Sequence, residues 1–563
     1  MKPTPNLPSR KPDAWLKRSP CQAAVATLLV VTAWPALAET PHRVVAGDTL
    51  WSIAEQHTGD ATQWRALQQA NRVADPHKLR IGQVLNVPMG AAGLPVAHAT
   101  VVFVQGEALA TGPDGQQVGP LRSGASVPEG TLIEVRDKSF VRLRLADGSA
   151  FGLSPGSTAR LERLRRDDGT QQSHTVIRML SGRVESEVVP RQHPQTRFDV
   201  HTPMAVASVR GTRFGVSVSP DEATSEVSAG KVAVRSLLNR RQTTTLAAGD
   251  GARVGAAGGL QRATLLPAVD LSALPSTWDD GEFVSFALPT QPQAQAYRVR
   301  VLQADTPGAV LREAWVKDPA VLWQALDDGP YTLTVQGLDK LGLLGQTAEH
   351  PFQVQATPAA PLYRQPAAGA TVSGANLTLR CTELLEVAGY RIQVASDVSF
   401  SQPLVDVTRP DRCEHVAQLP PGSYHWRVAS LAAGTPNRQG PFSLPSPFVV
   451  SADAPNAGTD ADNTTFWSPR AGLSYRVQLA ADAGFTRVLS DDWLRGSQVA
   501  LPTGGEAVYL RWQSRDTQGH TSRLSAVHRV TPSQSGLRTE DNKPVRGGDN
   551  TIGTGNSPLQ QPR

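Results

Sequence analysis

The stretch from Val44 to Pro88 decides how the N-terminal part of the chain folds. It begins Val44-Val45-Ala46-Gly47-Asp48-Thr49-Leu50-Trp51-Ser52-Ile53-Ala54, continues as Trp64-Arg65-Ala66-Leu67-Gln68-Gln69-Ala70-Asn71 and ends Leu79-Arg80-Ile81-Gly82-Gln83-Val84-Leu85-Asn86-Val87-Pro88. Val44 and Val45 suit a buried strand, and Gly47-Asp48 is a turn signal before a helix that Asp48 or Thr49 can cap. Two apolar stripes at helical spacing and a last strand follow. The stretch predicts strand, helix, helix and strand.

These residues resemble the LysM module, a small unit that usually holds peptidoglycan or chitin. In that family the sugar lies in a shallow groove between the turn after the first strand and the loop before the last. The resemblance implies a groove made by Gly47, Asp48, Thr49 and Leu50 on one wall, and by Val73, Leu79, Ile81 and Gly82 on the other. Ile81 departs from a proline that is common in the family at this place. We interpret Trp51 and Leu67 as core side chains.

Residues 1–38 have the features of an export signal. They start with a basic stretch, carry an apolar core from Ala23 to Ala33 and end in Ala36-Leu37-Ala38. This core is short for a membrane span, and a small-x-small site predicts cleavage after Ala38 and export to the bacterial periplasm. An uncleaved anchor is the alternative. Cys21 precedes the apolar core, so we do not expect it to carry a lipid.

The chain has 563 residues and a formal net charge of +5, much of which comes from the leader. The leader holds five basic residues and one acid, so the remainder is close to neutral. A charge this small gives no electrostatic reason to expect nucleic-acid binding. No later stretch reaches membrane-spanning length, so we expect no membrane span after signal cleavage. Abundant Pro and Gly with few aromatic residues favour several domains of short strands.

After a linker at 90–99, residues 100–265 change to short strands of alternating polarity. Val141-Arg142-Leu143-Arg144-Leu145 alternates strictly, and Asp147-Gly148 follows as a hairpin-type turn. The period of two recurs around Phe198, Phe214 and Val232, and no segment has the pattern of a long helix. The region is therefore predicted to be a β domain.

Residues 120–255 also resemble the FecR domain. The resemblance is carried by Leu145-Ala146-Asp147-Gly148-Ser149, Leu153-Ser154-Pro155-Gly156-Ser157, Leu180-Ser181-Gly182-Arg183-Val184, Phe198-Asp199-Val200-His201-Thr202-Pro203-Met204-Ala205-Val206-Ala207-Ser208-Val209-Arg210-Gly211-Thr212-Arg213-Phe214, Val227-Ser228-Ala229-Gly230-Lys231-Val232 and Ala247-Ala248-Gly249-Asp250. The family is named for a regulator that senses an outer-membrane iron transporter and signals inward to a sigma factor. That role needs a cytoplasmic segment and a membrane helix, which we do not find in the sequence. We therefore carry over only the fold, many short strands wound as a small solenoid.

Two pairs of residues in this region have both a functional and a structural interpretation. Arg210 and Arg213 flank Gly211, and such a pair can grip a carboxylate or phosphate. We favour a structural turn in which the guanidinium groups pair with nearby carbonyls or with Asp199. His193 and His201 lie on either side of a Pro-containing loop without other ligands at metal-binding spacing, so we expect no metal site.

The C-terminal half contains a threefold internal repeat. Tyr297-Arg298-Val299-Arg300-Val301 recurs as Tyr390-Arg391-Ile392-Gln393-Val394 and as Tyr475-Arg476-Val477-Gln478-Leu479, and each first Tyr is followed by another 34 positions later. Copies spaced by 93 and 85 residues suit β-sandwiches. They resemble fibronectin-III or Ig-like domains, which we place at 270–356, 360–450 and 457–532 with Pro-rich joints between them. We expect Arg298, Arg391 and Arg476 on the solvated face of a half-buried strand.

Only Cys381 and Cys413 remain after signal cleavage. In an oxidising compartment two cysteines can pair, and we favour this disulfide over two free buried thiols. From about residue 533 to residue 563 the chain loses its apolar residues, so we expect a disordered tail.

The sequence predicts a mainly β multidomain protein: a βααβ LysM module at 42–89, a wound FecR-like β domain and three sandwich repeats. Catalytic motifs are absent from the sequence, so we expect neither an enzyme nor a cofactor or metal. The leading hypothesis is an exported protein that binds peptidoglycan, a GlcNAc-containing glycan, and presents β domains to an envelope protein partner for assembly or sensing. The alternatives are a FecR-like signalling component that contacts a membrane sensor or transporter, and a surface adhesin.

Overall fold

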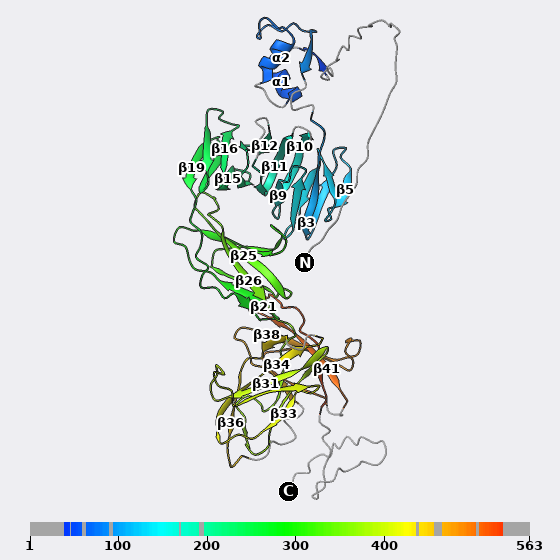
Figure 1. Cartoon of the computed structure of the whole chain (residues 1–563), viewed down its shortest axis with the longest axis vertical. Helices are drawn as coiled ribbons and strands as arrows, with labels where there is room; N and C mark the ends of the chain where they lie inside the picture. The colour runs from blue at the N-terminus through cyan, green and yellow to red at the C-terminus, as the bar shows by residue number, and fades with distance from the viewer. Residues whose placement is uncertain are drawn as a thin grey trace, which may run out of the picture. The chain divides into compact units, whose positions relative to one another are not determined.

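The computed structural model describes most of the chain between residues 39 and 532. The described ranges are 39–45, 47–58, 63–88, 94–167, 171–190, 196–434, 438–454, 464–502 and 506–532. The chain divides into two compact units, residues 1–94 and residues 95–563. Within the described ranges, α-helices occur in the first unit and strands make up the ordered elements of the second (Figure 1). The expected class, a mainly β multidomain fold, is confirmed. The expected leader and tail lie outside the described residues.

The first unit has the expected order of strand, helix, helix and strand. Its elements are β1 (Glu39–Arg43), α1 (Leu50–Thr58), α2 (Trp64–Ala70) and β2 (Val84–Pro88). β1 and β2 are antiparallel. The first strand ends before Val44, earlier than the sequence suggested, although Val44 is still buried. Apolar side chains from both helices and from β2 meet in one small core: Val44, Leu50, Ile53, Ala54, Leu67 and Leu85.

Side-chain hydrogen bonds fix the ends of the two helices. Thr49 caps α1, because its Oγ1 accepts a bond from the Ser52 amide at 3.0 Å while the Ser52 hydroxyl accepts one from the Thr49 amide at 2.8 Å. Asn71 follows the last residue of α2, and its side-chain amide exchanges two bonds of 2.6 Å with the backbone of Asn86 in β2. Each helix is therefore tied to the turn or strand beside it.

The second unit begins with a wound β domain, in which the chain passes repeatedly between two sheets. The first sheet runs β5 (Gln117–Pro120), β4 (Ala108–Thr111), β7 (Leu132–Val135), β10 (Thr158–Asp167), β11 (Gln172–Glu187), β12 (Arg197–His201), β13 (Ala205–Val209), β16 (Lys231–Ser236) and β17 (Thr243–Ala247). The second runs β6 (Ser126–Pro128), β3 (His98–Gln105), β8 (Phe140–Leu145), β9 (Ala150–Leu153), β11, β14 (Arg213–Val218), β15 (Glu222–Ala229), β18 (Asp250–Gly255) and β19 (Leu260–Thr264). The long strand β11 belongs to both sheets.

One continuous core joins the two sheets of this domain. Alternating residues of strands such as β8 point inward, and buried side chains of both sheets pack into a single cluster. The expected hairpin between β8 and β9 is present, with Gly148 at φ 84° in its turn. The winding that the sequence suggested therefore takes the form of two layers around a filled interior.

Three β-sandwich repeats follow the wound β domain and share one strand order. Repeat 1 has the sheet β20 (Thr277–Trp278), β26 (Ala348–Val354), β25 (Gly329–Leu338), β22 (Ala296–Gln303) and β23 (Val310–Val316), and the pair β21 (Phe283–Ala287) and β24 (Ala320–Gln324). Repeat 2 has β28 (Thr371–Val372), β36 (Ser446–Val450), β34 (Gly422–Ala432), β31 (Val387–Ala395) and β32 (Val405–Pro410), with β35 (Gln439–Phe442) beside β34, and a second layer of β27 (Tyr363–Gln365), β29 (Leu377–Cys381) and β33 (Glu414–Ala417). Repeat 3 has β42 (His528–Val530), β41 (Val508–Arg515), β38 (Ser474–Ala480) and β39 (Val488–Leu494), and the pair β37 (Thr464–Phe466) and β40 (Gln498–Ala500).

The two tyrosines of the repeat motif make equivalent hydrogen bonds in different copies. The first tyrosine hydroxyl accepts a bond from a backbone amide just upstream in every copy: Gln291 to Tyr297, Leu384 to Tyr390 and Arg470 to Tyr475. The second tyrosine donates to the carbonyl four positions upstream in two copies: Tyr331 to Asp327 and Tyr424 to Pro420, at 2.9 Å each. The second arrangement is the tyrosine corner of Ig-like sandwiches, which explains why the spacing of the two tyrosines recurs.

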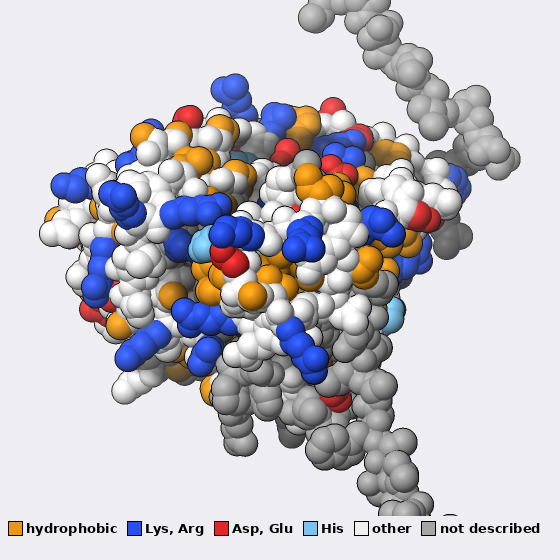
Figure 2. All heavy atoms as spheres, turned by 90° about the horizontal axis from the view of Figure 1, so that it is seen from above, with side chains coloured by type: hydrophobic (Ala, Val, Ile, Leu, Met, Phe, Trp, Pro, Cys, Tyr) orange, Lys and Arg blue, Asp and Glu red, His pale blue; other side chains and the backbone are white. Residues whose placement is uncertain are grey.

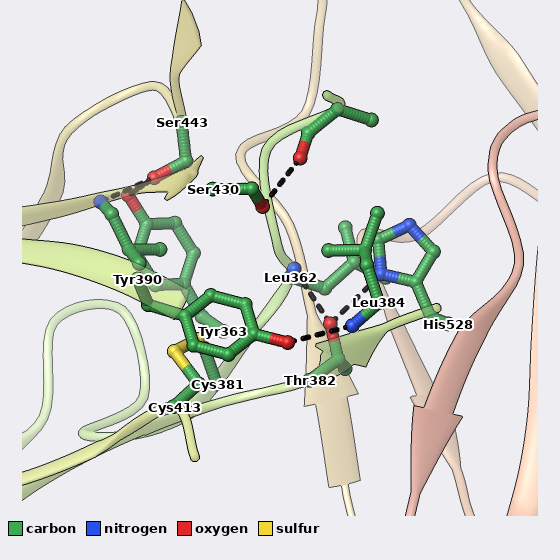
Figure 3. Close-up of a disulfide and its surroundings, with 12 residues drawn as sticks. Leu362, Tyr363, Cys381, Thr382, Leu384, Tyr390, Cys413, Ser430, Ser443 and His528 are labelled. Carbon is green, nitrogen blue, oxygen red and sulfur yellow. Dashed lines mark hydrogen bonds between the residues drawn. A yellow bond between two sulfur atoms is a disulfide. The ribbon is translucent and has the colours of Figure 1, made fainter. Parts of the chain in front are cut away.

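Repeats 2 and 3 are joined by strand pairing across the Pro-rich joint between them. β27 of repeat 2 pairs with β37 of repeat 3, and the short strand β30 (Glu383–Leu384) pairs with β42. Beside this junction, Cys381 and Cys413 form a disulfide, and the Thr382 hydroxyl lies 2.8 Å from Nδ1 of the buried His528 (Figure 3). Burial lowers the pKa of His528 to about 3, so the ring is neutral.

Candidate functional site

Two glycine turns of the first unit lie next to each other. The Gly82 amide donates to the Val44 carbonyl at 2.8 Å, and the Val44 amide donates to the Gln83 carbonyl at 2.8 Å. These bonds hold the turn after β1 against the loop before β2. Gly47 at φ +94° and Gly82 at φ +86° form the bends, and beyond their chain neighbours no atom lies within 4 Å of the place where a Cβ would be. The two expected walls are thus adjacent and open at both glycines.

The polar side chains of the first turn hold its shape. The Asp48 carboxylate accepts a bond from the Val45 amide at 2.9 Å and lies 2.9 Å from Nε2 of His42. Thr49 is exposed but uses its hydroxyl in the cap of α1. These bonds hold the described residues of the turn in place, which lowers the entropy cost of presenting them to a ligand.

The remaining expected site residues divide between core and surface. Leu50 is buried in the core, and Val73 and Leu79 pack against the same core. Ile81 is 74% exposed beside Gly82. Ile81 is therefore the most exposed large apolar side chain among the expected site residues, whereas Leu50 stabilises the core.

The interpretation of Trp51 as a core side chain is wrong. Trp51 is 48% exposed and stacks on Trp64, with ring centroids 4.5 Å apart and planes 22° apart. Leu50, Ile53 and Ala54 already fill the buried stripe of α1, and Trp51, one position after Leu50, lies about 100° around the helix from Leu50, beside the stripe. That offset was the signal in the sequence that places an exposed indole two residues after Thr49.

A cluster of charged side chains lies largely buried where the wound β domain meets repeat 1, with the side chain of Glu185 32% exposed. Arg298 is 1% exposed, contacts Glu185 of β11 and lies 2.8 Å from Glu313 of β23. Arg300 lies 2.6 Å from the second carboxylate oxygen of Glu185. Burial alone would raise the pKa of Glu185, but Arg298, Arg300 and Arg183 outweigh it and hold that pKa well below its usual range. The cluster has its charges compensated, so it is a structural joint.

The expectation that Arg298 faces solvent is therefore wrong, because its strand face is covered by the wound β domain. In the other copies the expectation holds better: Arg391 and Arg476 form half-exposed pairs with Asp406 and Asp491 at 2.6 Å. Each copy has an acid 15 positions after this arginine. That spacing was visible in the sequence and would have found all three ion pairs.

Of the two arginines that flank Gly211, Arg213 has a structural role. The carboxylate that Arg213 meets is Glu187, at 2.7 Å, and not the expected Asp199, which lies in β12 opposite Ser208. Arg142 donates to the same Glu187 carboxylate at 3.2 Å. Gly211 has φ +91°, and a Cβ there would collide with Pro190. The glycine is thus required by the packing of the turn. Arg210 is exposed.

The described residues hold no helix long and apolar enough to cross a membrane. Nor do three or more His, Cys, Asp or Glu side chains gather there as metal ligands. His193 lies outside the described residues, and His201 Nδ1 is 3.7 Å from Glu162. On the face drawn in Figure 2, basic side chains are scattered among apolar and neutral ones and form no single patch.

Models of two protein families match parts of the chain. The LysM domain model matches residues 42–88, which include both glycine turns, and the FecR protein model matches residues 131–233 inside the wound β domain. The chain contains a LysM domain and a FecR domain. Both resemblances inferred from the sequence are confirmed, and the first unit is hereafter called the LysM domain and the wound β domain the FecR domain.

Solved structures resemble parts of the second unit. A proposed anti-sigma factor from Parabacteroides distasonis is 20% identical over 24% of this chain, with a TM-score of 0.21, and the match spans 59% of its length. The FN1–FN3 domains of chicken CNTN1 are 13% identical over 46% of this chain and 96% of theirs, with a TM-score of 0.14. Fibronectin(III)-like modules of Clostridium thermocellum CbhA are 11% identical over 34% of this chain and 97% of theirs, with a TM-score of 0.16. None of the curated proteins compared matches the chain.

Proposed function

We propose that this is an exported, non-catalytic protein of the bacterial envelope that binds peptidoglycan through its LysM domain. The observation that carries the proposal is the pair of adjacent glycine turns inside the LysM match. A GlcNAc ring carries an amide, several hydroxyls and an apolar face. The free space beside Gly47 and Gly82 lets a sugar approach the backbone closely, and exposed Ile81 suits an apolar face. The groove comprises Gly47, Asp48, Thr49, Leu50, Val73, Leu79, Ile81 and Gly82.

Trp51 adds an aromatic surface to this proposed groove. Its indole is half exposed and held in place by Trp64. A fixed aromatic ring binds at a lower entropy cost than a mobile one, since less side-chain freedom is lost on binding. We therefore place one sugar ring of the glycan against Trp51.

Trp51→Ala is expected to weaken binding of a β-1,4-linked GlcNAc tetramer about two- to tenfold, because an aromatic contact contributes about 0.5–1.5 kcal/mol. Calorimetric titration of the chain from residue 39 onward measures this. Trp493→Ala is the matched control, since Trp493 is a comparably exposed tryptophan in repeat 3, at 41%. Equal affinities of the two variants would remove Trp51 from the site.

The β domains of the second unit are the part of the proposed protein that faces other envelope proteins. The FecR match favours a second candidate function, a signalling component that contacts a membrane sensor or transporter. A photocrosslinker at the exposed Arg210 in living cells separates the two functions. Capture of a sensor kinase or transporter supports signalling. Crosslinks to sacculus-bound proteins without any to a sensor or transporter support the assembly role.

A further inference from the structure

A cleft of about 1340 Å³ lies along one side of repeat 1. Its walls include β23 and β24 of repeat 1, residues 516–521 of repeat 3 and a few residues of the FecR domain. The Gln324 side chain donates to the Thr521 carbonyl at 2.8 Å, which holds the repeat 3 wall to β24. The cleft lies in the second unit and is therefore separate from the glycan groove.

Both strands of repeat 1 turn an edge toward the cleft. Successive side chains of a strand point to opposite faces, so a cleft on one face would be lined by every second residue. Here every residue from Leu311 to Val316 and from Ala320 to Gln324 lines the cleft. Among the described strands, β23 pairs with β22 alone and β24 with β21 alone. The outer edge of each strand is therefore open.

The open edge of β23 offers backbone hydrogen-bonding groups. Alternate N–H and C=O groups of an antiparallel edge strand point outward, and such an edge is a template for another strand. On β23 the Leu311 carbonyl accepts a bond from Arg312 at 2.8 Å, and the described residues supply no other partner on that side. A charged side chain on an edge strand can prevent the addition of another strand. On β23 the acid Glu313 pairs with Arg298 and is only 6% exposed, whereas its counterpart Asp491 in β39 is 32% exposed.

The side chains around the edge add an aromatic surface and positive charge. Trp315 is 51% exposed and Trp323 is half-buried, one on each strand. Lys138 and Arg312 line the cleft without a carboxylate partner among the described residues. The acid Asp516 is occupied by bonds from the backbone and ring of residue 520. The free charge in the cleft is therefore positive.

We propose that an extended segment of a partner protein adds to the β23 edge as an extra strand. Its backbone bonds to the open edge, alternate apolar side chains pack on Trp315 and Trp323, and an acidic side chain meets Lys138 or Arg312. β23 has seven residues, which sets the length of the segment. The partner segment is thus defined by its chemistry: it is extended, has apolar side chains at alternate positions and carries an acidic side chain.

Random ten-residue peptides displayed on phage and selected against the chain from residue 39 onward test the proposal. We expect enriched peptides with alternating apolar residues and an acid. Trp315→Ala is expected to weaken a selected peptide at least tenfold, and Trp493→Ala less than twofold. Trp493 is the matched control, because it lies opposite Arg476 in β39 as Trp315 lies opposite Arg298 in β23.

N-methylation of the selected peptide tests strand addition on the unmodified protein. Only every second amide of an added strand faces the receptor edge, so methyl groups on one set of alternate residues should abolish binding and those on the other set should preserve it. No enriched peptide, tolerance of both methylation patterns, or an affinity unchanged by Trp315→Ala would overturn the proposal. Self-association that Trp315→Ala abolishes would assign the edge to a second copy and overturn it equally.

Discussion

Arg298→Ala is expected to destabilise the joint between the FecR domain and repeat 1 by about 3–5 kcal/mol, because it leaves a buried carboxylate unpaired. Glu313 is 6% exposed, loses its charged partner and keeps the bond from the Trp315 indole at 3.0 Å, while Glu185 loses one of its arginines. Differential scanning calorimetry should show the unfolding transition of these domains at a lower temperature. Arg476→Ala is the matched control, since it removes the equivalent but half-exposed pair with Asp491 and should cost less than about 1 kcal/mol.

Acid pH provides a second readout of the same joint. Glu185 has a folded-state pKa well below its usual range, so its ion pairs stabilise the fold above the ordinary carboxylate pKa. That contribution is lost as the pH falls through the folded-state pKa. Arg298→Ala should therefore lose less stability than the unmodified chain on acidification. If Arg298→Ala and Arg476→Ala lowered the free energy of unfolding equally at neutral pH, the result would contradict a buried joint.

Removal of the disulfide by Cys381→Ser with Cys413→Ser is expected to destabilise repeat 2 by about 3–4 kcal/mol. The cysteines are 32 positions apart, and a loop of this size restricts the unfolded chain by about that much. Both residues are buried in the core of repeat 2, so the serines also bury hydroxyls there. Calorimetry with and without reductant measures the effect.

The response to reductant distinguishes a formed disulfide from two free thiols. A reductant should lower the unfolding temperature of the unmodified chain and leave the double-serine variant unchanged. If reductant left the unfolding temperature of repeat 2 unchanged in both proteins, the disulfide would not be formed.

Local patterns in the sequence were sufficient to predict much of the fold. Strict alternation around Val141 predicted a strand, and Asp147-Gly148 predicted its hairpin, because both depend on neighbouring residues. The 34-residue spacing of the tyrosines predicted the repeats, because the two residues occupy neighbouring strands of one sheet, β22 and β25 in repeat 1.

Features that depend on distant partners could not be predicted in the same way. Arg298 has the same local pattern as Arg476, and only the FecR domain lying against repeat 1 buries it. The pairing of β27 with β37 joins Tyr363 to Phe466, and no local pattern indicates it. In the candidate site, the order of turns followed from the LysM resemblance, and the place of Trp51 beside the apolar stripe of α1 indicated its exposure, but its stacking on Trp64 depends on how the two helices pack.

Sedimentation with purified peptidoglycan sacculi shows whether the LysM domain holds the protein to the cell wall. The chain from residue 39 onward and a shorter chain from residue 95 onward are each mixed with sacculi, and the pellet and supernatant are compared. We expect the longer chain to pellet with the sacculi and the shorter one to stay in solution. If both stay in solution, or if both pellet equally, the LysM domain does not anchor this protein to the wall.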